Sequence, residues 1–231
     1  MAIIKNMHLV IKIITVIMLL PFKGNAQSSG LGTWNIINTK YSINSKFSFF
    51  AEGQLRSLFF YRQFHYHEYK GGINYKVGKQ ITLTLAAGKY NTYSEGGNFK
   101  SPLRSDEFRL WPQLLIQQPL GNFKMDQRFR TEFRFTGNGY RTRLRYRLGL
   151  SKNFGAVKNG TQLYNAGINN ELFFALNEPY FERNRLLFFV TRRLNRLVVL
   201  QVGYLHQFDY RINDETGRDF LQTGVYFEFN K

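Results

Sequence analysis

The chain has 231 residues, of which 17% are aromatic and none is cysteine, and its formal net charge is +17. This length suits a single domain, and the lack of cysteine excludes disulfides, thiolate metal sites, thiol nucleophiles and a lipid anchor on an N-terminal cysteine. Such a charge in a soluble protein would indicate a nucleic-acid partner, but the basic residues here alternate with apolar ones, so we expect no nucleic acid.

The first segment is predicted to be an export signal. A basic start that includes Lys5 precedes an apolar run from Ile13 to Leu20, and small residues end at Ala26. The alternative is a membrane anchor, but the run is shorter than the roughly 20 residues that cross a bilayer. We therefore expect a cleaved signal peptide over 1–26 and a single domain over 27–231. No later apolar run has spanning length, so the mature chain is expected to be either soluble outside the inner membrane or a β-barrel in the outer membrane.

From about Leu31 the chain repeats segments in which apolar and polar residues alternate, separated by Gly, Asn, Ser, Lys or Pro. Strict alternation predicts strands with two unlike faces. Eleven segments qualify: 31–41, 47–56, 64–76, 80–87, 107–116, 123–135, 141–150, 164–174, 185–191, 198–207 and 221–229. Bacterial barrels normally have an even number of strands. We therefore expect 10 or 12, with the first segment outside the barrel or one strand missed.

The clearest pair of strands lies in the middle of the chain. Segment 123–135 places Phe129 and Phe133 on one face and arginines with one glutamate on the other. After the turn at 137–139, segment 141–150 alternates arginine with threonine, leucine and tyrosine. Together the segments predict an all-β fold, a single antiparallel transmembrane β-barrel of 10–12 strands.

A soluble sandwich or closed barrel with an apolar interior is the competing fold. The membrane barrel is favoured because each strand carries more bulky apolar residues than a small interior holds, and lipid would accommodate them outside. The segment Gln222–Phe229 also resembles the C-terminal strand signal that the outer-membrane assembly machinery reads, although Asn230 and Lys231 extend past the usual aromatic terminus. Expected partners are therefore this machinery, outer-membrane lipid and lipopolysaccharide, and the oligomeric state stays open.

Several short motifs resemble one bacterial family across the mature chain. They are Trp34, Glu52 to Arg56, the run Glu107-Phe108-Arg109-Leu110-Trp111-Pro112-Gln113, the arginine-rich hairpin 128–147, Asn170-Glu171, Arg183-Asn184-Arg185 and Gly203-Tyr204. In these motifs the chain resembles the family catalogued as "domain of unknown function 2490". The resemblance implies an outer-membrane barrel and no particular chemistry.

The candidate site is a ladder of charged residues on the polar faces of the strands. It comprises Glu107, Arg109, Arg128, Arg130, Glu132, Arg134, Arg141, Arg143, Arg145, Arg147, Glu171, Arg183 and Arg185. Facing a narrow lumen, these residues would form a structural plug of salt bridges. Nine arginines against four glutamates also allow a second interpretation, a small anion-selective pore.

A lipid-modifying enzyme is the third class considered. The mature chain has three histidines, His65, His67 and His206, and no serine is spaced to pair with any of them. His65 and His67 share the parity of apolar neighbours and are interpreted as membrane-interface residues. We therefore expect no catalytic residues, no metal site and no cofactor.

Two further groups are expected near the ends of strands. Four basic residues in loops would meet lipopolysaccharide phosphates or stay solvated: Lys100, Arg104, Arg211 and Arg218. Four aromatic residues would form interfacial girdles: Trp34, Tyr90, Tyr93 and Tyr180.

Overall fold

A computed structural model describes residues 30–94, 98–100, 102–158, 161–210 and 216–231. The expected signal peptide lies outside the described residues. The described part of the chain is all β. Its strands are β1 (Leu31–Ser42), β2 (Phe47–Phe59), β3 (Arg62–Lys76), β4 (Ile81–Tyr93), β5 (Leu103–Leu120), β6 (Phe123–Thr136), β7 (Gly139–Lys158), β8 (Thr161–Ala175), β9 (Phe181–Arg193), β10 (Val198–Asp209) and β11 (Thr216–Asn230). Each corresponds to one of the alternating segments.

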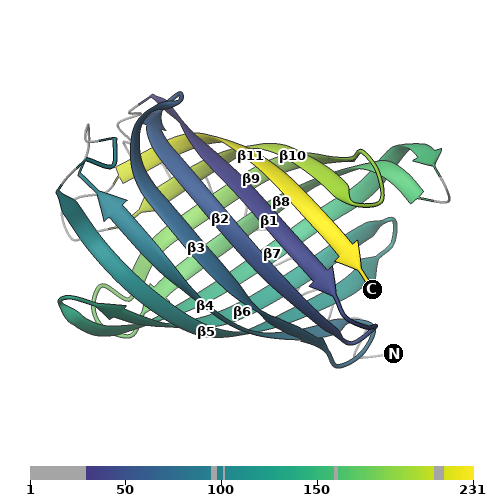
Figure 1. Ribbon diagram of the computed structural model, residues 1–231, viewed down its shortest axis with the longest axis horizontal. Coiled ribbons are helices and arrows are strands. Elements are labelled where there is room, and N and C mark those ends of the chain that lie inside the picture. Colours follow the sequence, from purple (N-terminus) through teal and green to yellow (C-terminus); the bar gives the residue numbers. More distant parts are fainter. Residues whose placement is uncertain (1–29, 95–97, 101, 159–160, 211–215) are drawn as a thin grey trace, which may run out of the picture.

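These strands form one closed barrel in which every strand pairs with its neighbours in sequence and β1 pairs with β11. Consecutive strands are antiparallel, whereas β1 and β11 run parallel over the register Leu31↔Asp219 to Ser42↔Asn230. Figure 1 shows the two arrows side by side, pointing to the same end. The expectation of an even strand count was therefore wrong. The first segment belongs to the barrel, and 11 strands in the described residues force one parallel pair at the closure.

The two ends of the barrel differ in their connections. One, here called the turn end, carries the links between Ser42 and Phe47, between Leu120 and Phe123, and between Arg193 and Val198. The other, called the loop end, carries the longer link between Tyr93 and Leu103. Because the strand count is odd, β1 starts at the loop end and β11 finishes at the turn end.

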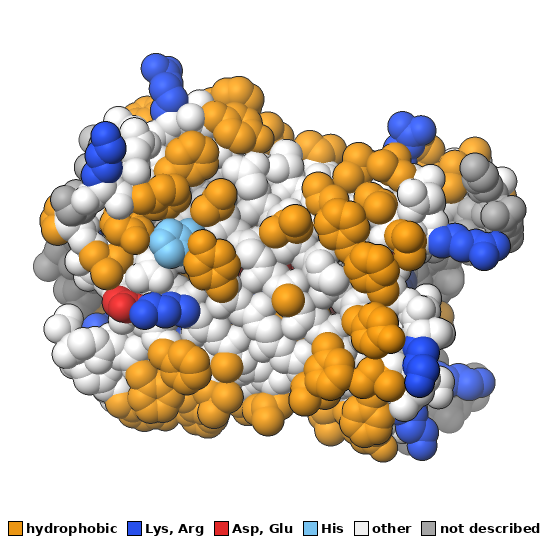
Figure 2. Space-filling view, viewed as in Figure 1, with side chains coloured by type: hydrophobic (Ala, Val, Ile, Leu, Met, Phe, Trp, Pro, Cys, Tyr) orange, Lys and Arg blue, Asp and Glu red, His pale blue; other side chains and the backbone are white. Residues whose placement is uncertain are grey.

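The outward faces of the strands are apolar. Phe129, Leu144, Phe188 and Val202 are among the large hydrophobic side chains that lie exposed there. In Figure 2 hydrophobic side chains are spread over the visible face, while most Lys and Arg side chains lie toward its two ends. In the described part of the chain, no helix has both the length and the apolar character needed to cross a membrane.

The inward faces also contain aromatic residues, which the alternation did not predict. Tyr66, Ala86, Tyr90 and Trp111 form one buried cluster. Trp34, Leu205 and Phe220 form a second. The assignment of Trp34 and Tyr90 to outer girdles was therefore wrong. Both are under 5% exposed and lie inside. Trp34 shares the parity of Asn38 on β1, and Tyr90 shares that of Thr92 on β4, and all four line the lumen cavity.

Candidate functional site: the lumen of the barrel

A connected set of ion pairs, here called the central ion network, crosses the lumen from β5 to β9. Six arginines and four glutamates form it: Arg109, Arg128, Arg130, Arg134, Arg143, Arg145, Glu107, Glu132, Glu171 and Glu182. Neighbouring strands bring these residues together because each strand turns its charged face inward. The network therefore ties five strands to one another through side chains as well as through the backbone.

Glu132 lies at the centre of this network. It is 0% exposed, and its carboxylate lies 3.5 Å from Arg130 and 3.8 Å from both Arg109 and Arg143. Arg145 donates a hydrogen bond to the same group. An isolated carboxylate would be very costly to bury, so this position depends on the guanidiniums around it.

Glu107 and Glu182 anchor the loop-end side of the network. Arg134 donates two hydrogen bonds, of 2.9 and 2.7 Å, to the Glu107 carboxylate. This is the bidentate geometry that arginine forms with carboxylates. Arg143 donates to Glu182 of β9 at 2.5 Å. The pairing of Arg143 with Glu182 spans β7 to β9 and so bypasses β8.

The remaining members of the predicted ladder lie outside the central ion network. Arg147 pairs with Asp126 at 2.6 Å, and Arg183 pairs with Asp209. Arg185 donates to the Gln207 amide oxygen at 2.8 Å. Arg141 is exposed near the start of β7, so it does not share the enclosed environment of the others.

A second ion cluster on β2 and β3 was absent from the predicted ladder. Glu68 is 3% exposed and binds Arg56 at 3.2 Å and Lys70 at 2.5 Å. Lys70 also contacts Glu52 at 2.5 Å. Their shared parity on each strand is the signal that could have identified them, but the lower density of charge there hid it.

Guanidiniums stack on the inward aromatic rings. The Arg56 guanidinium carbon lies 3.4 Å from the Trp34 ring centroid and 4.0 Å from that of Tyr66. Arg109 lies 3.8 Å over Tyr90. These distances are within the range of cation–π attraction, which strengthens when the groups are desolvated.

Phe173 and Trp111 also have guanidiniums stacked on their rings. Phe173 has Arg145 at 4.5 Å and Arg185 at 4.7 Å from its centroid, and Trp111 has Arg130 at 5.1 Å. Both rings are at most 1% exposed. Aromatic rings thus fill the space between arginine side chains that ion pairs alone would leave open.

The walls of the lumen cavity are strongly basic. The cavity is lined by 14 Lys or Arg side chains and five Asp or Glu side chains. Glu132, Glu182 and Asp126 add three further negative charges that pair with lining arginines. A positive potential therefore remains after pairing, and low-dielectric walls focus it.

His65 and His67 were both predicted to lie at the membrane interface, but they have different environments. The register shifts where Arg56 pairs with Tyr66 and Ser57 pairs with Phe64, which leaves His65 as the extra residue of a bulge. His65 accordingly lines the lumen cavity. His67 instead contacts the rings of Tyr93 and Phe99.

His206 lies on the outward face of β10. Its Nδ1 is 2.7 Å from Asp219 Oδ1, and the Tyr204 hydroxyl donates to the same oxygen at 2.5 Å. Among the described residues, no group of three or more His, Asp or Glu side chains is arranged to hold a metal ion.

Two of the four basic residues expected in loops instead belong to strands. Arg104 of β5 and Arg218 of β11 line the lumen cavity near the loop end. Lys100 lies in the β4–β5 connection, as predicted. Arg211 lies outside the described residues.

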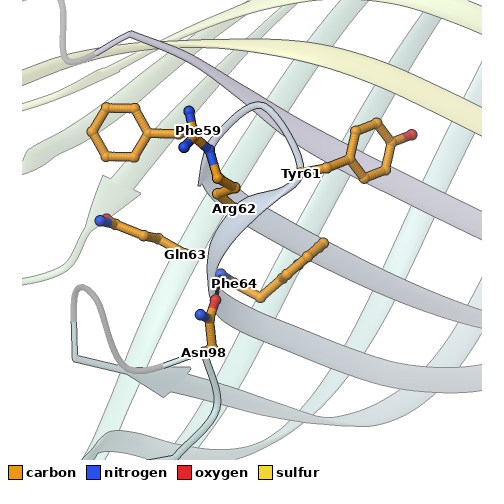
Figure 3. Close-up of a pocket in the computed structure, with 6 residues that line it drawn as sticks. All are labelled: Phe59, Tyr61, Arg62, Gln63, Phe64 and Asn98. Atoms are coloured by element: carbon orange, nitrogen blue, oxygen red, sulfur yellow. Dashed lines mark hydrogen bonds between the residues drawn. The ribbon is translucent and has the colours of Figure 1, made fainter.

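A separate shallow pocket lies at the β2–β3 turn. Figure 3 shows Phe59, Arg62 and Phe64 around it, with Asn98 arriving from the β4–β5 connection. The Phe64 backbone N–H donates to Asn98 Oδ1 at 2.9 Å. This hydrogen bond ties the two connections at the loop end, and none of the pocket's lining residues lines the lumen cavity.

Comparison with known proteins gives a family and no function. No curated protein and no solved structure matches the chain. The family described as "Protein of unknown function (DUF2490)" matches residues 31–218, which run from the start of β1 into β11. Since the match covers most of the chain and nearly the whole barrel, this protein belongs to the DUF2490 family.

Proposed function

We propose that the protein is an outer-membrane β-barrel whose lumen is a structural plug, held shut by the central ion network and the rings stacked on it. The outward apolar side chains support the membrane location, because hydrocarbon would bury surface that water would leave exposed. Backbone closure over the full circle supports it too, since a spanning sheet in lipid tolerates no free edge.

The observation that carries the plug is the complete burial of Glu132 among four arginines. A wide aqueous channel would leave a wall carboxylate in contact with water. Trp111 is likewise 0% exposed although it faces inward. The burial of both side chains supports a lumen that charged and aromatic groups narrow at this level.

The proposal includes two partners. Val225, Phe227 and Phe229 alternate along β11, which supports recognition of this strand by the outer-membrane assembly machinery. Lipopolysaccharide is the lipid partner, and Lys100 at the loop end would contact its phosphates. The proposal assigns the protein no catalytic activity, and lipid analysis of cells with and without the protein tests this.

Conductance of planar bilayers tests the plug. The wild-type barrel should give no stable conductance steps. Arg143→Glu should give steps and lower the temperature at which the folded band is lost on gels, because it places a new carboxylate beside Glu132 and Glu182. Breaking a buried pair in this way costs about 3–5 kcal/mol.

Arg141→Glu is the matched control for this experiment. It makes the same chemical change two residues away on β7, where the side chain is exposed, and should leave both readouts unchanged. Equal effects of the two substitutions would contradict the plug.

A small anion-selective pore is the second candidate, favoured by the excess of basic side chains around the cavity. Stable steps in the wild type with a reversal potential set by the anion gradient would establish the pore and reject the plug.

A further inference from the structure

Four guanidiniums surround the single carboxylate of Glu171. Arg147 and Arg185 lie directly opposite it on β7 and β9. Arg145 donates to its Oε1 atom at 2.8 Å, and Arg128 donates to the same oxygen. Glu171 and all four arginines line the lumen cavity.

The local charge is not balanced by protein groups. Arg147 uses Asp126 as its partner, at 2.6 Å. Arg185 donates to the neutral amide of Gln207 and stacks between Trp34 and Phe173 at 4.8 and 4.7 Å. Arg145 also pairs with Glu132, but three further arginines share that carboxylate. The four cluster arginines therefore contact three carboxylates, of which Glu132 is already surrounded by other guanidiniums.

Buried donors in the same group lack partners. The Nε atoms of Arg128 and Arg147 are buried without a hydrogen-bond partner among the described residues. These two arginines are also directly opposite each other on β6 and β7, and like charges in that position destabilise a strand pair. An anion between the strands would remove both penalties.

We propose that this cluster, here called the Glu171 oxyanion site, binds a compact, water-soluble oxyanion of the phosphate type. Guanidinium forks match the oxygens of phosphate geometrically and form short charge-assisted hydrogen bonds with them. Arg128, Arg147 and Arg185 supply the forks. Asn169, two residues before Glu171 on β8 and also in the cavity wall, supplies a neutral donor.

The ligand enters beside Arg147. Its side chain is 24% exposed, against 14% for Arg128 and 10% for Arg145. The site depends only on the arrangement inside the lumen. It therefore goes beyond the proposed plug. Phosphate binding tests the site, and bilayer conductance tests the plug, so either proposal can fail without the other.

Phosphate binding to the mature chain, folded in a non-ionic detergent, tests the site. Calorimetric titration with inorganic phosphate should show saturable binding that chloride at equal ionic strength does not reproduce. Phosphate should also raise the unfolding temperature, because a ligand that binds only the folded state stabilises it.

Arg147→Gln and Arg185→Gln should each weaken phosphate binding by about tenfold or more. Arg192→Gln is the matched control, since Arg192 is exposed on β9, with the opposite parity to Arg185, and it should bind as the wild type does. The Arg147 side chain is more exposed than those of Arg128 and Arg145. Arg147→Gln should therefore keep the folded band on gels even if Arg185→Gln does not fold.

Glu171→Gln gives a prediction of opposite sign. Removing the competing carboxylate frees Arg128 and leaves Arg145 paired only with Glu132, so phosphate should bind more tightly than to the wild type. The proposal is overturned if the wild type shows no saturable phosphate binding, or if Arg147→Gln binds phosphate as well as Arg192→Gln does.

Discussion

At the residue scale, Glu132 is a buried charge that holds neighbouring strands together through its ion pairs. Its carboxylate is fully enclosed and lies within 4 Å of four guanidiniums from β5, β6 and β7. Removing its charge leaves those guanidiniums buried with less compensation. The free energy of unfolding lost by such a change far exceeds the contribution of an exposed ion pair.

Glu132→Gln should therefore lower the free energy of unfolding by about 3–5 kcal/mol, as measured by urea denaturation in detergent. Asp106→Asn is the control, because Asp106 forms an exposed pair with Lys89 at 3.1 Å, with side chains 46% and 58% exposed. Its loss should change the free energy of unfolding by about 0–1 kcal/mol. A small effect of Glu132→Gln would contradict a structural role for the network.

The positions of the inward aromatic side chains are hard to predict from the sequence. Alternation identifies the inward charges at Glu107 and Arg109, but hydrophobicity alone places Trp111 outside, although it shares their parity. Trp111 and Phe173 lie inside because guanidiniums stack on their rings, a compensation that no pattern of apolar and polar residues encodes. Ion-pair partners such as Glu182 depend on the tilt of neighbouring strands and were equally hidden.

At the element scale, the strands were predictable and their register was not. Period-two alternation recurs along the chain, and all the predicted strands formed, including segment 185–191, where the apolar run Leu186 to Val190 blurs the alternation. The bulge at Arg56/Ser57 shifts the pairing of β2 with β3, which moves His65 to the lumen. A shift of one residue reverses every facing, so local parity cannot be extrapolated through it.

The contact of β3 with β4 gives a prediction at this scale. A Cβ atom on Gly72 would lie 2.4 Å from the Ala86 Cβ and 2.5 Å from the Leu85 carbonyl oxygen. Gly72→Val should therefore push the strands apart, disturb Trp111 and destabilise the fold by about 1–3 kcal/mol. Red-shifted tryptophan fluorescence together with a lower urea midpoint would show this.

Gly78→Ala is the control for that substitution. Gly78 lies in the β3–β4 connection, and a Cβ atom there would have no neighbour within 4 Å. Its spectrum and urea midpoint should match those of the wild type. If Gly72→Val behaves in the same way, the close approach of the two strands is not as described.

At the scale of the whole molecule, the odd strand count places the start of β1 and the end of β11 at opposite ends of the barrel. The β6–β7 turn lies at the loop end and Lys231 follows β11 at the turn end. Longer loops face outward in outer-membrane barrels. The proposed location therefore places the two positions on opposite sides of the membrane.

An epitope inserted at Asn138 should be detected by antibody on intact cells, whereas the same epitope placed after Lys231 should be detected only after permeabilisation. The first position tests surface exposure, and the second controls for leaky cells. Identical accessibility of both epitopes would contradict a barrel that spans the membrane in this orientation.

The parallel seam also determines how the barrel responds to force. Because β1 and β11 run in the same direction, traction applied between Leu31 and Asn230 pulls the two strands along their length in opposite senses. All 12 register pairs from Leu31↔Asp219 to Ser42↔Asn230 then bear load together. A barrel with an antiparallel seam has both termini at one rim and unzips pair by pair, so this one should rupture in a single step at higher tension.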